Sequence, residues 1–146
     1  MKFINKSNIS IEALTHAKQH IKPYNSERLR YIKFGETENQ LLDFYGKFSL
    51  PKNKKWTIVA CVHKDWKYPL KDRIAVASEK IDAKKWKYRF VEHIFQTYDE
   101  AILYTFLHEW FHFIKHTKQI STKEFGRQGE PSANKYALHW LKEYGY

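Results

Sequence analysis

The sequence lacks the marks of several protein classes. Its 146 residues include one cysteine, Cys61, so no disulfide can form within the chain. The longest apolar run is too short to span a membrane, and the first residues lack the apolar segment and small-residue cleavage site of a signal peptide. No repeat, low-complexity tract or linker divides the chain, so we expect one domain over residues 1–146. These absences favour a cytoplasmic protein that does not associate with membranes.

Acidic residues are scarce relative to basic ones. The chain has 16 Asp and Glu against 26 Lys and Arg, a net charge of +10. Residues 52–89 hold 12 of the basic residues and 4 of the acidic ones, with Trp and Tyr between them. Such a region could bind nucleic acid through charge and ring stacking. The favoured alternative is a set of strands with aromatic side chains toward the core and lysines toward water, because net charge reports mainly on solubility and non-specific association.

The pattern of apolar residues predicts an α+β fold. Hydrophobic residues make up 42% of the chain and aromatic residues 17%, a globular composition. Alternation and turn signals predict strands over 29–34, 42–50, 56–63, 73–78 and 86–95, and helices over 11–21, 97–118 and 130–143. Residues 56–63, WTIVACVH, form the most apolar strand and are expected in the middle of their sheet. Residues 119–129 are expected to form a loop.

The first predicted helix begins after Ser10, which can cap it. Its buried stripe is expected to comprise Ile11, Leu14, Ala17, Lys18 and Ile21. His16 and His20 are then expected on a partly solvated face rather than at a metal, since no carboxylate lies between them.

The helix predicted over 97–118 carries the chemistry. Thr97 and Glu100 have the spacing of a capping box at its start. Apolar residues then lie on every side, which indicates a buried helix. Within it, His108 and His112 stand four residues apart in an HExxH sequence, so both imidazoles can face one metal ion, with Glu109 beside it. Three ionisable groups in a core helix would be costly without a partner, and a metal ion supplies one.

A catalytic zinc usually has three protein ligands and one open position. Glu130 begins the last predicted helix, and Ala133 and Ala137 on the same side would let that helix approach the HExxH helix closely. Glu130 is therefore the preferred third ligand, with Asn134, one turn on, holding a histidine from behind. Other candidates for the third ligand are His139, Glu124 and His116.

These residues resemble a known family. HEWFH followed by a helix that begins Glu-x-x-Ala-Asn-x-Tyr-Ala looks like the Glu-zincin metallopeptidases, and within them is most similar to the ImmA/IrrE-type peptidases. The resemblance covers residues 104–141. It implies a zincin-like fold, in which a small mixed sheet packs on the active-site helix and an edge strand binds peptide by strand addition. It also implies Zn²⁺ held by His108, His112 and Glu130, with Glu109 as general base, in an endopeptidase that cuts a regulatory protein.

A rival resemblance is to the SprT-like proteases, which act on DNA-bound proteins. Their third ligand is usually a histidine, which would promote His139 or His116, and the basic region 52–89 suits their substrates. Two non-enzymatic hypotheses also stay open. One is a nucleic-acid-binding module with a structural metal, and the other is a metal-binding inhibitor that cuts nothing. Tyr104 and Tyr136 have the chemistry to stabilise an oxyanion, and the sequence assigns that role to neither.

Overall fold

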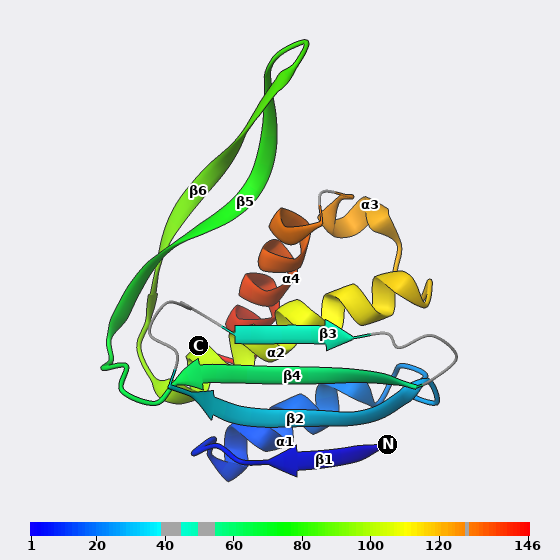
Figure 1. Cartoon of the computed structure of the whole chain (residues 1–146), viewed down its shortest axis with the longest axis vertical. Helices are drawn as coiled ribbons and strands as arrows, with labels where there is room; N and C mark the ends of the chain where they lie inside the picture. Colours follow the sequence, from blue (N-terminus) through cyan, green and yellow to red (C-terminus); the bar gives the residue numbers. More distant parts are fainter. Residues whose placement is uncertain (39–44, 50–54, 128) are drawn as a thin grey trace.

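The computed structural model describes residues 1–38, 45–49, 55–127 and 129–146 (Figure 1). The elements follow in the order β1 (Lys2–Asn5), α1 (Ile11–Ile21), β2 (Leu29–Thr37), β3 (Tyr45–Ser49), β4 (Trp56–His63), β5 (Leu70–Asp82), β6 (Lys85–Phe95), α2 (Tyr98–His116), α3 (Thr122–Phe125) and α4 (Glu130–Glu143). The mixture of strands and helices confirms the α+β prediction. The short helix α3 lies where a loop was expected, and part of the strand predicted over 42–50 lies outside the described residues.

Four strands form a mixed sheet in the order β1-β2-β4-β3. β1 and β4 both run parallel to β2, whereas β3 is antiparallel to β4. The apolar strand β4 therefore occupies an interior position, as predicted, and alternate residues from Trp56 to Val62 are buried. β2 continues through Gly35 to Thr37, beyond the predicted end of the strand at 34. A larger residue at Gly35 would be crowded, since a Cβ at this position would lie 3.1 Å from the Cys61 sulfur.

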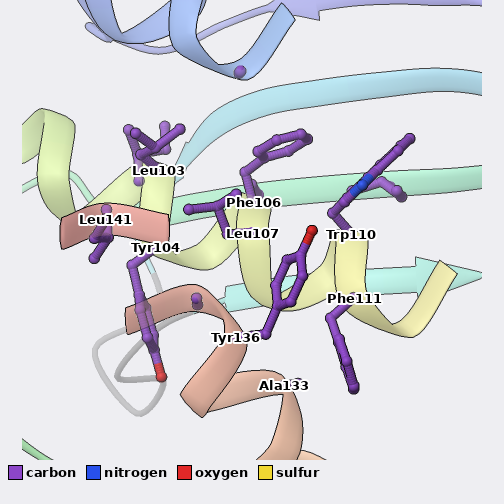
Figure 2. Packing of buried hydrophobic residues seen from close by; sticks show 14 of the residues in the cluster. Leu103, Tyr104, Phe106, Leu107, Trp110, Phe111, Ala133, Tyr136 and Leu141 are labelled. Atoms are coloured by element: carbon purple, nitrogen blue, oxygen red, sulfur yellow. The ribbon is translucent and has the colours of Figure 1, made fainter. Parts of the chain in front are cut away.

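The helices α1 and α2 lie on the same face of this sheet (Figure 1). α2 is buried on nearly all sides, as its sequence predicted, because α4 packs on the side away from the sheet (Figure 2). Thr97 caps α2 by accepting a hydrogen bond from the Glu100 amide at 3.2 Å. The Glu100 carboxylate reaches back to the Gln96 amide at 2.7 Å, which satisfies a further donor at the start of the helix.

The buried face of α1 differs from the predicted one. Ser10 caps the helix as expected, but Ile11 is 85% exposed and Lys18 is also exposed. His20 is buried instead, with its two ring nitrogens 2.6 Å and 2.7 Å from the hydroxyls of Tyr144 and Tyr136. These two bonds compensate the loss of hydration, so a polar residue can occupy the face toward α4.

β5 and β6 form a separate two-stranded antiparallel sheet that projects beyond the rest of the molecule (Figure 1). β5 is longer than the strand predicted over 73–78, because it begins at Leu70 and continues to Asp82. The base of this hairpin is anchored in the core through Ile74, Val76 and Phe95. Its outer part is exposed on both faces, including Trp86 and Tyr88. The expectation that aromatic residues of the basic region face the core holds for Trp56 and is wrong for Trp86 and Tyr88.

We predict that His20 makes the free energy of unfolding depend on pH. Burial lowers the pKa of His20 from 6.5 to about 4. Between these values the unfolded chain binds a proton that the folded chain does not, so stability is complete above pH 6.5 and falls as the pH drops toward 4. The expected loss over this window is about 3 kcal/mol.

Urea unfolding of the wild type and of His20→Gln at a series of pH values would measure this effect. The stability advantage of the wild type should shrink steadily below pH 6.5. A constant difference between the two proteins over the window would contradict the assignment.

Candidate metal centre

His108 and His112 lie one turn apart on α2, on the side that faces the start of α4. Their Nε2 atoms are 3.3 Å apart, so both imidazoles turn toward one point. Both residues are only partly exposed, in a helix whose other faces are buried. The arrangement is the one predicted from the spacing of four residues.

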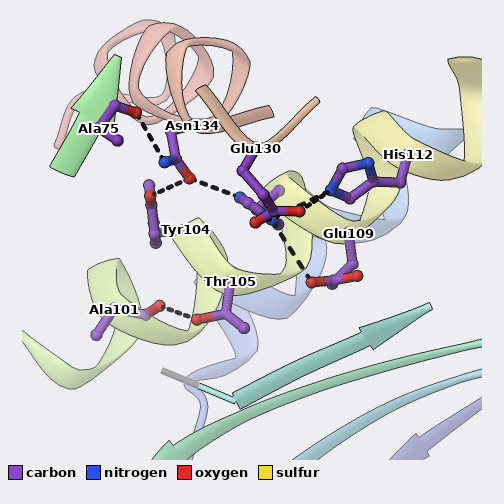
Figure 3. Close-up of polar contacts among 9 residues, drawn as sticks. Ala75, Ala101, Tyr104, Thr105, Glu109, His112, Glu130 and Asn134 are labelled. Carbon is purple, nitrogen blue, oxygen red and sulfur yellow. Dashed lines mark hydrogen bonds and ion pairs between the residues drawn. The ribbon is translucent and has the colours of Figure 1, made fainter. Parts of the chain in front are cut away.

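Glu130, the first residue of α4, completes the cluster (Figure 3). Its Oε2 lies 2.9 Å from the His108 Nε2, and its Oε1 lies 2.9 Å from the His112 Nε2. Gly129 directly precedes Glu130 and caps the start of α4. Its φ of 60° is a backbone conformation that residues with a Cβ rarely adopt. Ala133 and Ala137 are completely buried, which allows the close approach of α4 to α2.

Asn134 holds His108 from behind. Its Nδ2 donates to the carbonyl oxygen of Ala75 in β5 at 2.8 Å, and this bond sets the orientation of the amide because a carbonyl can only accept. Its Oδ1 accepts from the Tyr104 hydroxyl at 2.8 Å and lies 2.7 Å from the His108 Nδ1. Since Oδ1 cannot donate, His108 must carry a proton on Nδ1. In the neutral imidazole, Nε2 is then an acceptor.

This tautomer leaves the His108 Nε2 free to accept a proton or to bind a metal ion. An acceptor nitrogen of His108 faces a carboxylate oxygen of Glu130 at 2.9 Å, an arrangement that needs a proton or a metal ion between the two atoms. Burial lowers the pKa of His108, but the hydrogen bond and charge of Glu130 outweigh it and raise that pKa overall. The two histidines in turn hold the pKa of Glu130 well below its usual range.

The three side chains lie close enough together to share one metal ion. Atoms bound tetrahedrally at ~2.0–2.1 Å from a zinc ion lie ~3.3 Å from one another. Here the two nitrogens are 3.3 Å apart, and each lies 2.9 Å from a different oxygen of the Glu130 carboxylate. One ligand atom from each of the three residues lies within 4.8 Å of the other two. Two imidazoles and a carboxylate are also a donor set that suits Zn²⁺. Among the described residues, His108, His112 and Glu130 are the one group of at least three such side chains close enough to share an ion.

Glu109 lies beside the cluster. Its carboxyl Oε1 is 3.8 Å from the His108 Nε2, and the residue is 8% exposed. Burial raises the pKa of Glu109, while the neighbouring histidines lower it by a smaller amount. A carboxylate in this position can exchange a proton with a molecule held between it and the three ligands.

A pocket of about 540 Å³ opens onto the cluster. His108, Glu109, Glu130 and Asn134 form its floor with Tyr104 and Thr105. The base of the β5–β6 hairpin forms the facing wall through Asp72, Arg73, Ile74, Ala75, Tyr88 and Phe90. The volume lies within the range of small-molecule and peptide side-chain sites.

The other predicted candidates lie elsewhere. The His116 ring packs against Trp56, and the His139 ring packs against Phe125. Glu124 and His139 line a different pocket of about 270 Å³. None of the three belongs to the cluster. Of the two tyrosines, Tyr104 lines the pocket beside His108 and Glu130, whereas the Tyr136 hydroxyl is hydrogen-bonded to His20.

The hairpin wall is the part of the site that the sequence interpretation missed. Its residues come from strands recognised only in part, and no local motif marks Asp72 or Arg73. The available signal was the alternation of Trp86, Tyr88 and Phe90 in the most basic part of the chain, which places the three on one face of a strand.

No protein-family model matches the sequence, and searches of curated proteins and of solved structures found no significant similarity.

We predict that Asn134 strengthens zinc binding through His108. Asn134→Ala removes the acceptor for the His108 Nδ1 proton and should weaken zinc affinity about 10- to 100-fold. Asn134→Asp keeps this acceptor while losing the donor to Ala75, so it should recover much of the affinity. Competition against a fluorescent zinc chelator would measure both, with Lys142→Ala, exposed on the same helix, as control. Equal losses in the Ala and Asp variants would point to a purely structural role.

Proposed function

We propose that the protein is a zinc-dependent endopeptidase. The observation that carries the proposal is the convergence of His108, His112 and Glu130 beside the carboxylate of Glu109. Three of these residues, His108, Glu109 and Glu130, line an open pocket. Three protein ligands leave one position of a tetrahedral zinc for water or substrate, which distinguishes a catalytic site from a closed structural one.

Each residue has a role in peptide hydrolysis. His108, His112 and Glu130 would hold the ion, and Asn134 would keep His108 in the tautomer that ligates through Nε2. When bound, zinc supplies an activated water and polarises the scissile carbonyl. Glu109 would accept a proton from the attacking water and return it to the departing amine. The Tyr104 hydroxyl lies at the pocket but donates to Asn134, so we assign it to positioning rather than to the oxyanion.

The arrangement of the sheet supports a zincin-like fold. β3 is the antiparallel edge strand of the mixed sheet, and together with β4 it packs against α2. The resemblance to ImmA/IrrE-type peptidases implies such an edge strand beside the active-site helix, where substrate can add as a further strand. Glu130 between the two imidazoles favours this resemblance over the SprT-like one, which calls for a histidine.

Metal content of the purified protein tests the ligand set. We expect about one zinc per chain in the wild type and in His139→Ala, and a strongly reduced content in Glu130→Ala, because only Glu130 closes the three-ligand site. Zinc lost in His139→Ala and kept in Glu130→Ala would overturn the assignment in favour of the SprT-like one. No zinc in any sample after addition of the metal would remove the basis of the enzyme proposal.

The role of Glu109 predicts a separation of metal binding from catalysis. Glu109→Gln keeps the size of the side chain and removes the base, so the variant should bind zinc like the wild type and cleave at least about 100-fold more slowly. Cleavage sites in a proteome-derived peptide library, identified by mass spectrometry, provide the readout. Chelator should abolish wild-type cleavage, and added zinc should restore it. Wild-type rates in Glu109→Gln would contradict the mechanism.

A further inference from the structure

The β5–β6 hairpin presents three large aromatic side chains to solvent. Trp86 is 61% exposed, Tyr88 51% and Phe90 42%. They occupy alternate positions of β6, so they lie on one face of the hairpin. We call this set the aromatic face. Both register shifts in the hairpin fall where β5 has an extra residue, so β6 keeps its regular alternation through this span.

The aromatic face is continuous with the candidate metal centre. Phe90 and Tyr88 line the same pocket as His108 and Glu109, and Trp86 lies farther along the strand toward the hairpin tip. Figure 1 shows this outer part of the hairpin extending past α4 without contact to the sheet. Exposed apolar surface that leads into a pocket is the usual mark of a binding site rather than of a core.

The charges along this face favour a particular occupant. The Arg73 guanidinium lies 4.4 Å from the centre of the Phe90 ring, and the Lys80 ammonium lies 5.9 Å from that of Trp86. Lys84 and Lys85 at the tip are exposed as well, and they outnumber the one exposed carboxylate beside them, Asp82. The tip therefore suits acidic groups beside apolar ones. At the pocket end, the carboxylates of Asp72 and Glu109, which lie outside the proposed ligand set, disfavour the closely spaced phosphates of a nucleic acid.

The spacing of the rings matches an extended polypeptide. Side chains two residues apart on β6 are separated by ~6.6–6.8 Å, and a second extended chain alongside presents its own alternate side chains at the same interval. Successive apolar side chains of such a segment could each meet one ring. The pocket of about 540 Å³ then receives the part nearest the metal ligands.

We propose that the aromatic face is the substrate-binding arm of the metal centre. It binds an extended polypeptide segment with bulky apolar side chains at alternate positions and acidic residues toward the hairpin tip. The inference deepens the proposed peptidase function and rests on it for the identification of the bound segment as a substrate.

Binding to the zinc-loaded Glu109→Gln protein tests the proposal without cleavage of the probe. The probe is a fluorescein-labelled unstructured peptide with alternating phenylalanine and serine, flanked by aspartates, measured by fluorescence anisotropy. Adding Trp86→Ala or Tyr88→Ala should raise its Kd about tenfold, because each removes a large contact surface. Changing the phenylalanines to alanine should weaken binding similarly. The control is Val91→Ala, an exposed apolar residue on the opposite face of β6, which should leave the Kd unchanged.

Equal affinities in Trp86→Ala, Tyr88→Ala and Val91→Ala would overturn the proposal. A second result would also overturn it: the protein binds labelled oligothymidine tightly and does not bind the peptide, and Trp86→Ala and Tyr88→Ala abolish the oligothymidine binding. The aromatic face would then bind nucleic acid. His108→Ala removes one proposed zinc ligand. If this variant still binds the peptide, and Trp86→Ala weakens that binding as before, the arm is upheld independently of the zinc site. Zinc-dependent cleavage of phenylalanine-containing peptides at wild-type rate in Trp86→Ala and Tyr88→Ala would uphold the peptidase and eliminate the arm.

Discussion

The side-chain amide of Asn134 joins three elements that are distant in sequence. From α4 it donates to the backbone of β5, and it accepts from Tyr104 and His108 of α2. The backbone carbonyl of Ala75 cannot donate, so it determines the orientation of the amide, and the amide determines the tautomer of His108. In the neutral imidazole, the His108 nitrogen that faces Glu130 is therefore an acceptor. The electrostatics of the candidate site follow from one hydrogen bond to a strand that contributes no ligand.

The cost of burying polar groups explains why each polar side chain of the site has a hydrogen-bonding or charged partner. α2 is surrounded by the sheet, α1 and α4, and a helix in that position ordinarily carries apolar side chains only. His108 and Glu109 line the pocket beside α2, and the imidazoles of His108 and His112 both contact Glu130. Removing one partner would leave another group buried and unsatisfied, which costs more than the bond itself contributes. The same reasoning applies to His20, whose two ring nitrogens are hydrogen-bonded in the core to the hydroxyls of Tyr136 and Tyr144.

The predictable parts of the structure are those that depend on short-range signals. Thr97 and Glu100 mark the start of α2 within four residues, and helical periodicity alone brings His108 and His112 together. Glu130 could be selected because Ala133 and Ala137 mark the side of α4 that approaches α2. The buried face of α1 was predicted wrongly because its decisive partners, Tyr136 and Tyr144, lie more than a hundred residues away. A prediction from the sequence of α1 alone cannot place His20 on the buried face, because its burial depends on these two tyrosines.

The hairpin shows a second limit of sequence patterns. Alternation places Trp86, Tyr88 and Phe90 on one face of a strand, but it does not reveal whether any other element covers that face. Here the core covers the base of the hairpin, through Ile74 and Phe95, and leaves the outer aromatic residues exposed. The anchored base is also where Ala75 meets Asn134. Ala75 in the wall of the pocket is therefore joined to His108 at its floor through the amide of Asn134.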